Sequence, residues 1–132
     1  MSVKSRTGEA TLRLYPHKST VGFPAVLARA RMIELMELAA ARLMKPNLRD
    51  TESSVSIEMR VTHVASTTVG GTLRAVATNA GVAGRLHRFR INVFDESGLV
   101  GSAEHTRAVI TERRVLARAR RRADKAAAQS MV

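Results

Sequence analysis

The chain has 132 residues, of which 45% are hydrophobic and only 3% aromatic, so it can form one domain whose core must be largely aliphatic. Cysteine is absent, which excludes disulfides, thiolate metal sites and a cysteine nucleophile. Lysine and arginine outnumber aspartate and glutamate by 22 to 11, and the net charge of +11 favours an anionic partner: nucleic acid, a membrane surface or a phosphate-bearing ligand.

The first third of the chain predicts one strand followed by one long helix. The N-terminal residues form no apolar signal core and no apolar run is long enough to span a bilayer, so a cytoplasmic location is expected. Residues 8–15 are predicted as a strand. The helix is expected at about 23–45, because Pro24 suits a first helical turn and a helix stops before Pro46. It is apolar over most of its circumference, which is typical of a buried helix.

Glu37 is the exception on this helix. At roughly 100° per residue it falls in the same direction as Ile33, Ala40 and Met44, which predicts a carboxylate in the middle of the apolar face. An unpaired buried charge costs several kcal/mol or neutralises itself, and folding does not require one here. Either backbone amides or an arginine satisfy this acid, or it has a function.

The rest of the chain predicts four strands and a final helix. Period-2 alternation and turn signals place the strands at 54–64, 72–79, 86–94 and 99–111. Three of them follow one another through short turns, which favours an antiparallel meander. A helix at about 112–128 closes the chain.

The alternation in 54–64 predicts one apolar face that ends in His63. The other members of this face are Val55, Ile57, Met59 and Val61. A histidine in such a place is either a packed core residue or a partner for a buried acid such as Glu37, which can orient an imidazole and keep it basic. His87 is expected to pack among apolar neighbours. His105 lies on the same strand face as Arg107 and is expected to flank the site.

The last helix is strongly basic. Residues 111–125 hold seven bases and two acids, which supply +5 of the net charge. Such a run most often forms a solvent-exposed helix face. The more specific alternative is that the helix binds nucleic acid. Aromatic stacking platforms and nucleic-acid motifs are absent, so nucleic acid is not the partner that the sequence favours.

The predicted order of one long helix followed by an antiparallel sheet resembles the hotdog fold. Four segments narrow the resemblance to the fluoroacetyl-CoA thioesterase type of hotdog thioesterases, over residues 10 to 120. They are residues 23–26, 32–37, 61–63 and 101–110. The resemblance implies an α+β hotdog domain over 1–132, in which an antiparallel sheet wraps around one long buried helix and the basic helix is an addition. It also implies a homodimer, possibly a higher homo-oligomer, with active sites between protomers.

The resemblance also assigns roles to individual residues. In that family a Thr–Glu–His set carries out the chemistry; its Glu matches Glu37 and its His matches His63. A late-strand arginine near the acyl-CoA site matches Arg107, and a phenylalanine that shapes the acyl pocket matches Phe23. No metal and no separate cofactor are expected, since coenzyme A enters as part of the substrate.

Two positions depart from the family pattern. Arg29 stands where the family has its threonine, eight residues before Glu37, and Ser56 stands where the family has a glycine, seven residues before His63. Both are expected to line the substrate site. Without the threonine, Glu37 is the expected general base or nucleophile, with His63 as its partner in proton transfer.

The sequence therefore favours an acyl-CoA thioesterase. Three alternatives stay open: a non-catalytic acyl-CoA or ligand-binding hotdog protein, which the exchange at Arg29 supports; a hotdog hydratase or dehydratase; and a nucleic-acid-binding module on the last helix. The sequence does not distinguish the acyl group, or coenzyme A from a carrier-protein thioester.

Overall fold

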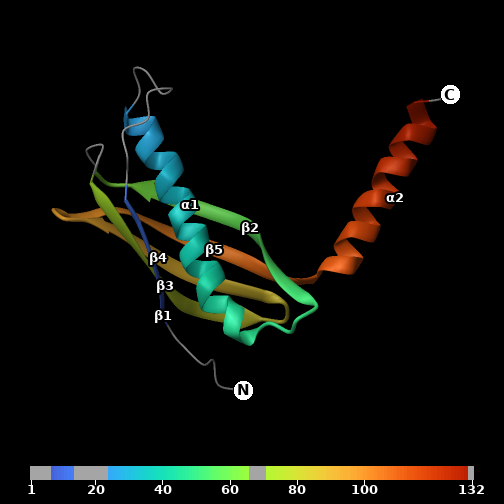
Figure 1. Ribbon diagram of the computed structural model, residues 1–132, viewed down its shortest axis with the longest axis horizontal. Coiled ribbons are helices and arrows are strands. Elements are labelled where there is room, and N and C mark those ends of the chain that lie inside the picture. The colour runs from blue at the N-terminus through green and yellow to red at the C-terminus, as the bar shows by residue number, and fades with distance from the viewer. Residues whose placement is uncertain (1–6, 14–23, 66–70, 131–132) are drawn as a thin grey trace.

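The computed structural model describes residues 7–13, 24–65 and 71–130 of the chain (Figure 1). Five strands and two α-helices follow one another in the predicted order. They are β1 (Thr7–Arg13), α1 (Pro24–Met44), the short 3-10 helix η1 (Lys45–Asn47), β2 (Glu52–His63), β3 (Thr72–Ala83), β4 (Leu86–Asp95), β5 (Gly98–Thr111) and α2 (Glu112–Ser130).

The strands form one antiparallel sheet in the order β1-β3-β4-β5-β2. The meander β3-β4-β5 is confirmed, and β1 and β2 are the edge strands. α1 lies across one face of this sheet (Figure 1). Several inward side chains of the sheet are small (Ala75, Ala77 and Ala103), so the helix can approach it closely.

The core lies between α1 and the sheet and is aliphatic, as the composition predicted. Met32, Met36 and Leu43 form the buried face of the helix, and Ile91 and Phe89 are among the largest buried side chains beneath it. The helix packs closely on β5 at Gly101, which has no side chain. A Cβ placed on Gly101 would come within 2.5 Å of the Met32 sulfur.

The prediction that Glu37 lies in the middle of the buried helix face is wrong. The buried face centres on Met32 and Met36, and Glu37 follows Met36 by one residue, about 100° around the helix. Glu37 is half-buried, as is Ile33. The reason is that a single sheet covers one side of α1 only, so a residue on the flank of the helix borders solvent and a pocket.

The prediction of one continuous apolar face on β2 is also wrong. A β-bulge interrupts the pairing with β5: Ser56 pairs with Arg107 and Glu58 with Thr106, which leaves Ile57 without a partner residue. The extra residue reverses the alternation, so Val55 and Met59 face opposite sides of the sheet. Met59, Val61 and His63 do share the inner face, whereas Ile57 is 57% exposed.

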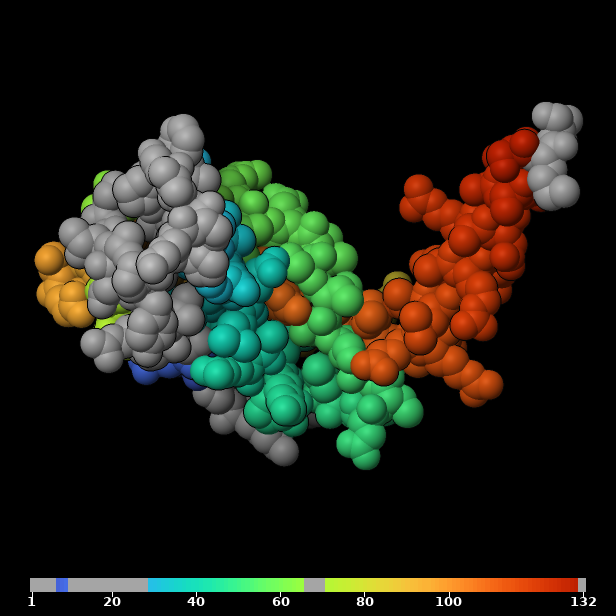
Figure 2. Space-filling view, turned by 45° about the horizontal axis from the view of Figure 1, so that its top comes forward, coloured from blue at the N-terminus to red at the C-terminus, as the bar shows by residue number. Residues whose placement is uncertain are grey.

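α2 leaves the end of β5 and stands clear of the rest of the molecule in both views (Figure 1, Figure 2). All of its residues are exposed. Within the described ranges no helix is long and apolar enough to cross a membrane.

Candidate active site

The inner face of the sheet carries a polar row where β5 nears its end. Arg107 on β5 pairs with Ser56 on β2 and with His87 on β4, so these three residues face the same side. Apolar rows continue from there toward the other end of the sheet. Arg107 is only 7% exposed, and a guanidinium so deeply placed needs partners for its donors.

Three hydrogen bonds hold Arg107 in one orientation, and a fourth holds its partner His105. Its Nε donates to the Ser54 hydroxyl over 3.0 Å, and its Nη2 donates to the Ser54 carbonyl over 3.1 Å. Its Nη1 donates to Nε2 of His105 over 3.1 Å, and Nδ1 of His105 meets the Glu58 carbonyl at 2.8 Å. The guanidinium is therefore fixed by side chains and backbone of β2 and β5 together.

These contacts define the state of the buried His105. Arginine can only donate, so Nε2 must accept, and the Glu58 carbonyl can only accept, so Nδ1 must carry the proton. The ring is the neutral Nδ1–H tautomer. Burial lowers the pKa of His105, helped by the charge of Arg107; the Glu58 hydrogen bond and the Glu37 carboxylate act in the opposite direction.

Glu37 faces this network from the helix. Burial lowers the pKa of the Arg107 guanidinium and the charge of Glu37 raises it, so the acid and the base interact across the gap between α1 and β5. Both line a pocket of about 400 Å³ between the two elements, with mostly apolar walls. The other lining residues are Arg31, Glu34, Leu35, Leu38 and Ala41.

The rim of the pocket is open to solvent. Arg31 and Glu34 form an ion pair of 3.3 Å at the surface of α1, and Leu38 is 43% exposed beside them. Exposed pairs of this kind contribute little stability. A small, mostly apolar cavity with Glu37 and the fixed Arg107 in its wall suits a ligand with an apolar end and a polar or charged end.

His63 is not joined to Glu37 within the chain. It pairs with Gly101, which lies six residues before Arg107 on β5, and this separation is roughly 20 Å along the strand. No hydrogen bond or ion pair between described residues links the two side chains. The Nε2 atom of His63 is buried and has no hydrogen-bond partner in the described part of the chain. An orphaned buried nitrogen is costly and calls for a missing partner.

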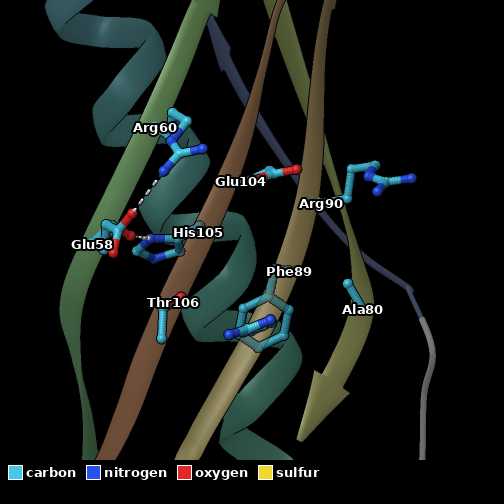
Figure 3. Close-up of a pocket in the computed structure, with 9 residues that line it drawn as sticks. Glu58, Arg60, Ala80, Phe89, Arg90, Glu104, His105 and Thr106 are labelled. Carbon is cyan, nitrogen blue, oxygen red and sulfur yellow. Dashed lines mark hydrogen bonds and ion pairs between the residues drawn. The ribbon is translucent and has the colours of Figure 1, made fainter.

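A second hollow, of about 420 Å³, lies on the opposite face of the sheet (Figure 3). Figure 3 shows Glu58, Arg60 and Glu104 around it, with the His105 ring reaching back toward Glu58. Arg60 and Glu58 pair at 3.7 Å and are both largely exposed. This hollow holds neither Glu37 nor His63, so it is a solvated charged surface and not the candidate active site.

The predicted site residues therefore fall into three groups. Glu37 and Arg107 are brought together, and Ser56 lies directly opposite Arg107 but is exposed. Arg29 is exposed on α1, and His63 lies apart from Glu37. Phe23 is outside the described residues.

Sequence reasoning missed Ser54, which holds Arg107 with both its hydroxyl and its carbonyl. The strict alternation of β2 had hidden it, because the bulge at Ile57 moves Ser54 to the inner face. No group of three or more potential ligands for a metal ion occurs among residues 7–13, 24–65 and 71–130.

Comparison with known proteins identifies the family to which the chain is similar. A family model described as fluoroacetyl-CoA-specific thioesterase matches residues 11–113. A fluoroacetyl-CoA thioesterase from Streptantibioticus cattleyicolor is 39% identical over 98 residues, which are 74% of this chain and 70% of that protein.

Solved structures agree with this placement. A variant of the fluoroacetyl-CoA thioesterase in complex with acetyl-CoA superposes with a TM-score of 0.81 at 30% identity, covering 92% of this chain and 98% of that chain. A thioesterase superfamily member from Thermus thermophilus gives a TM-score of 0.83 at 22% identity, covering 92% and 93% of the two chains, and supports the fold. The predicted hotdog fold is confirmed, and so, at the level of the family, is a thioester hydrolase that acts on acyl-CoA. The chain belongs to the fluoroacetyl-CoA-specific thioesterase family.

Proposed function

We propose that this protein hydrolyses an acyl thioester of coenzyme A, with Glu37 and Arg107 at the centre of the site. The observation that carries the proposal is the pocket between α1 and β5, whose mostly apolar walls include both the Glu37 carboxylate and the fixed Arg107 guanidinium. Membership of the thioesterase family supports the same reaction.

In the proposed reaction Glu37 acts as general base. It takes a proton from a water molecule as the water oxygen attacks the thioester carbonyl carbon. The carbon–sulfur bond then breaks, and the proton passes to the departing thiolate, which gives a carboxylic acid and free coenzyme A. Arg107 offers a fixed positive charge to the oxyanion of the intermediate, and a pre-positioned charge lowers the barrier because it needs no reorganisation.

His105 serves as a positioning residue in this scheme. It touches Arg107 and not the substrate pocket, and its neutral tautomer supplies the acceptor that aims Nη1. Ser54 supplies the second support through its hydroxyl and carbonyl. Groups locked in this way hold a catalytic charge within the narrow tolerance that catalysis requires.

We further propose a homodimer that completes the site with His63. β2 is an edge strand of 12 residues that pairs only with β5 among the described residues and carries the exposed Ile57, so pairing with a second copy would cover a surface that is otherwise prone to aggregation. Antiparallel pairing of two β2 strands about their middle brings the His63 end of one beside the Ser54 end of the other. That end adjoins Arg107, so a pairing of this kind offers the orphaned His63 nitrogen a partner across the interface.

Arg29 favours a second candidate, a protein that binds acyl-CoA without hydrolysing it. The family resemblance places a threonine hydroxyl at this position, and the side chain here is an exposed cation instead. An exposed cation suits the phosphates of coenzyme A.

The deciding experiment measures free thiol released from a panel of short-chain acyl-CoA esters, including fluoroacetyl-CoA. We expect turnover by the wild type and a loss of at least a hundredfold in Glu37→Gln, since a general base typically contributes 10²–10⁴-fold. Glu104→Gln is the control, because Glu104 is an exposed acid on the outer face of the sheet and does not line this pocket. Equal rates for wild type and Glu37→Gln would sink the assignment, and tight binding without turnover would favour the second candidate.

A further inference from the structure

α2 is attached to the rest of the protein at its first turn only. β5 runs directly into it, and the Ser53 hydroxyl donates a hydrogen bond of 2.5 Å to the Glu112 carboxylate. Beyond that point the helix stands free, and every residue in it is exposed (Figure 2). None of its surface contributes to the core.

The helix concentrates positive charge. It has seven bases and two acids, Glu112 and Asp124, which gives a net charge of +5. The bases are Arg113, Arg114, Arg118, Arg120, Arg121, Arg122 and Lys125. No carboxylate of the described residues forms an ion pair with any of them. Like charges held together repel one another, so this arrangement favours an external anion.

The charge is also ordered around the helix. At 100° per residue, five of the bases fall within an arc of roughly 100°. These are Arg114, Arg118, Arg121, Arg122 and Lys125. The opposite side is a narrow stripe of Leu116 and alanines, and Val115 lies at the edge of the basic arc. The helix is about 28 Å long, and its basic face, from Arg114 to Lys125, is a straight track of about 17 Å.

The proposed thioesterase site does not account for this track. The fixed cation of the site is Arg107, and α2 begins five residues, about 17 Å, further along the chain. From there α2 projects outward (Figure 1). One coenzyme A molecule with its few phosphates does not need seven bases over such a length.

The composition of the helix selects among anionic partners. A helix that lies on a membrane needs bulky apolar or aromatic residues on its other face, and here that face is mostly alanine. Single-stranded nucleic acid is bound by stacking on aromatic rings, and α2 has none. The absence of aromatic side chains does not count against a duplex, whose stacked bases are not available and whose phosphates line the surface.

We propose that α2 binds the phosphate backbone of double-stranded nucleic acid without regard to sequence. Six of the seven bases are arginine, whose planar fork donates two hydrogen bonds to one phosphate. An α-helix fits the major groove of duplex DNA, which is about 12 Å wide. The inference is independent of the thioesterase proposal, because it uses no residue of that site.

The test is fluorescence anisotropy of the full chain with labelled duplex DNA, duplex RNA and single-stranded DNA over a range of salt concentrations. The variant Arg118→Ala/Arg121→Ala/Arg122→Ala removes three charges and keeps good helix formers, and circular dichroism checks that helix content is retained. The matched control is Arg60→Ala/Arg88→Ala/Arg90→Ala, which removes three exposed arginines from the outer face of the sheet. Both variants carry the same net charge.

We expect the wild type to bind a duplex more tightly than a single strand, with a slope of log affinity against log salt of about −4 to −5 for five phosphate contacts. The α2 variant should lose at least tenfold in affinity and about three units of slope, whereas the control should stay within about threefold. The DNA and RNA arms identify the duplex that is preferred. Equal losses in both variants, no duplex binding, or binding only to anionic vesicles or to an acidic protein would each overturn the proposal.

Discussion

The Arg107 guanidinium donates through Nη1 to Nε2 of His105 over 3.1 Å, and both side chains are buried. A cation beside a histidine is stable only while that histidine is neutral. The arrangement therefore makes the position of Arg107, and with it the polarity of the Glu37 pocket, depend on the proton state of His105.

Removing the acceptor on His105 should release Arg107. His105→Phe keeps a ring of similar size but leaves the buried Nη1 donor unpaired, which costs about 1–3 kcal/mol. We expect kcat for acyl-CoA hydrolysis to fall about tenfold or more. His105→Gln retains an uncharged acceptor near the position of Nε2 and should recover most of the rate. Rescue by Gln distinguishes positioning from a general packing defect, and no difference between the two variants would contradict the role.

The pH dependence of activity should carry the same signature. Protonation converts Nε2 of His105 into a donor and breaks the bond from Arg107. Because burial lowers the pKa of His105 from its ordinary value of 6.5, activity should hold below that pH and fall only at more acidic values. The acidic limb of kcat/KM should change in His105→Gln, which cannot titrate. If wild type and His105→Gln lose kcat/KM over the same acidic pH range, a group other than His105 causes that loss.

Stability should depend on pH in the same direction. With the folded pKa below that of the unfolded chain, the unfolded chain binds more protons between the two values. The free energy of unfolding is then highest above 6.5 and declines as the pH falls toward the folded pKa. Urea unfolding at about pH 7.5 and pH 5 should show a smaller difference in His105→Phe than in the wild type. Burial lowers the pKa of His87 as well, so part of the difference should remain.

Mixing two inactive variants tests the proposed dimer. If His63 of one chain serves Glu37 of the other, a heterodimer of Glu37→Gln and His63→Ala contains one intact site. Random exchange should then restore about a quarter of the wild-type rate, since half of the dimers are mixed and each has one working site. Sedimentation of the same samples measures the dimer. Failure to regain activity in a confirmed mixed dimer would place both residues in one chain.

Arg29 offers a gain-of-function test. Arg29→Thr restores the hydroxyl that the family resemblance places eight residues before Glu37, and Arg29 is exposed, so stability should change by less than about 0.5 kcal/mol. We expect turnover of fluoroacetyl-CoA to rise severalfold. Arg31→Thr, on the same helix, is the control for loss of charge at the pocket rim. If both variants gain equally, the hydroxyl is not the cause.

Gly8 tests the packing of α1 against β1. A Cβ at this position would lie 2.8 Å from Cβ of Leu43 and 3.0 Å from the Ala39 carbonyl oxygen, and neither neighbour is the end of a flexible side chain. Gly8→Ala should therefore lower the free energy of unfolding by about 1–3 kcal/mol, measured by thermal or urea denaturation. Thr78→Ala, an exposed substitution at a neighbouring strand, should have a much smaller effect. An unchanged unfolding midpoint in Gly8→Ala would mean that α1 shifts away from β1 at little cost in free energy.

Local patterns determined the elements of this protein. Alternation, turn glycines and the two prolines around the first helix predicted every strand and helix in order, because these signals act over a few residues. Motif order also indicated the family. The presence of Glu37 and Arg107 at one pocket was within reach of the resemblance, since each matched a family position.

Tertiary structure decided which side chains meet. The bulge at Ile57 moved Ser54 to the inner face, and a strict period of two cannot reveal one inserted residue. The burial of Glu37 depended on how much of α1 a single sheet covers, which the helix sequence does not state. The tautomer of His105 follows from a donor on one strand and a carbonyl on another, brought together only by pairing of β2 with β5. Contacts between distant segments are set by register and packing, so they were decided by the fold and not by the pattern along the chain.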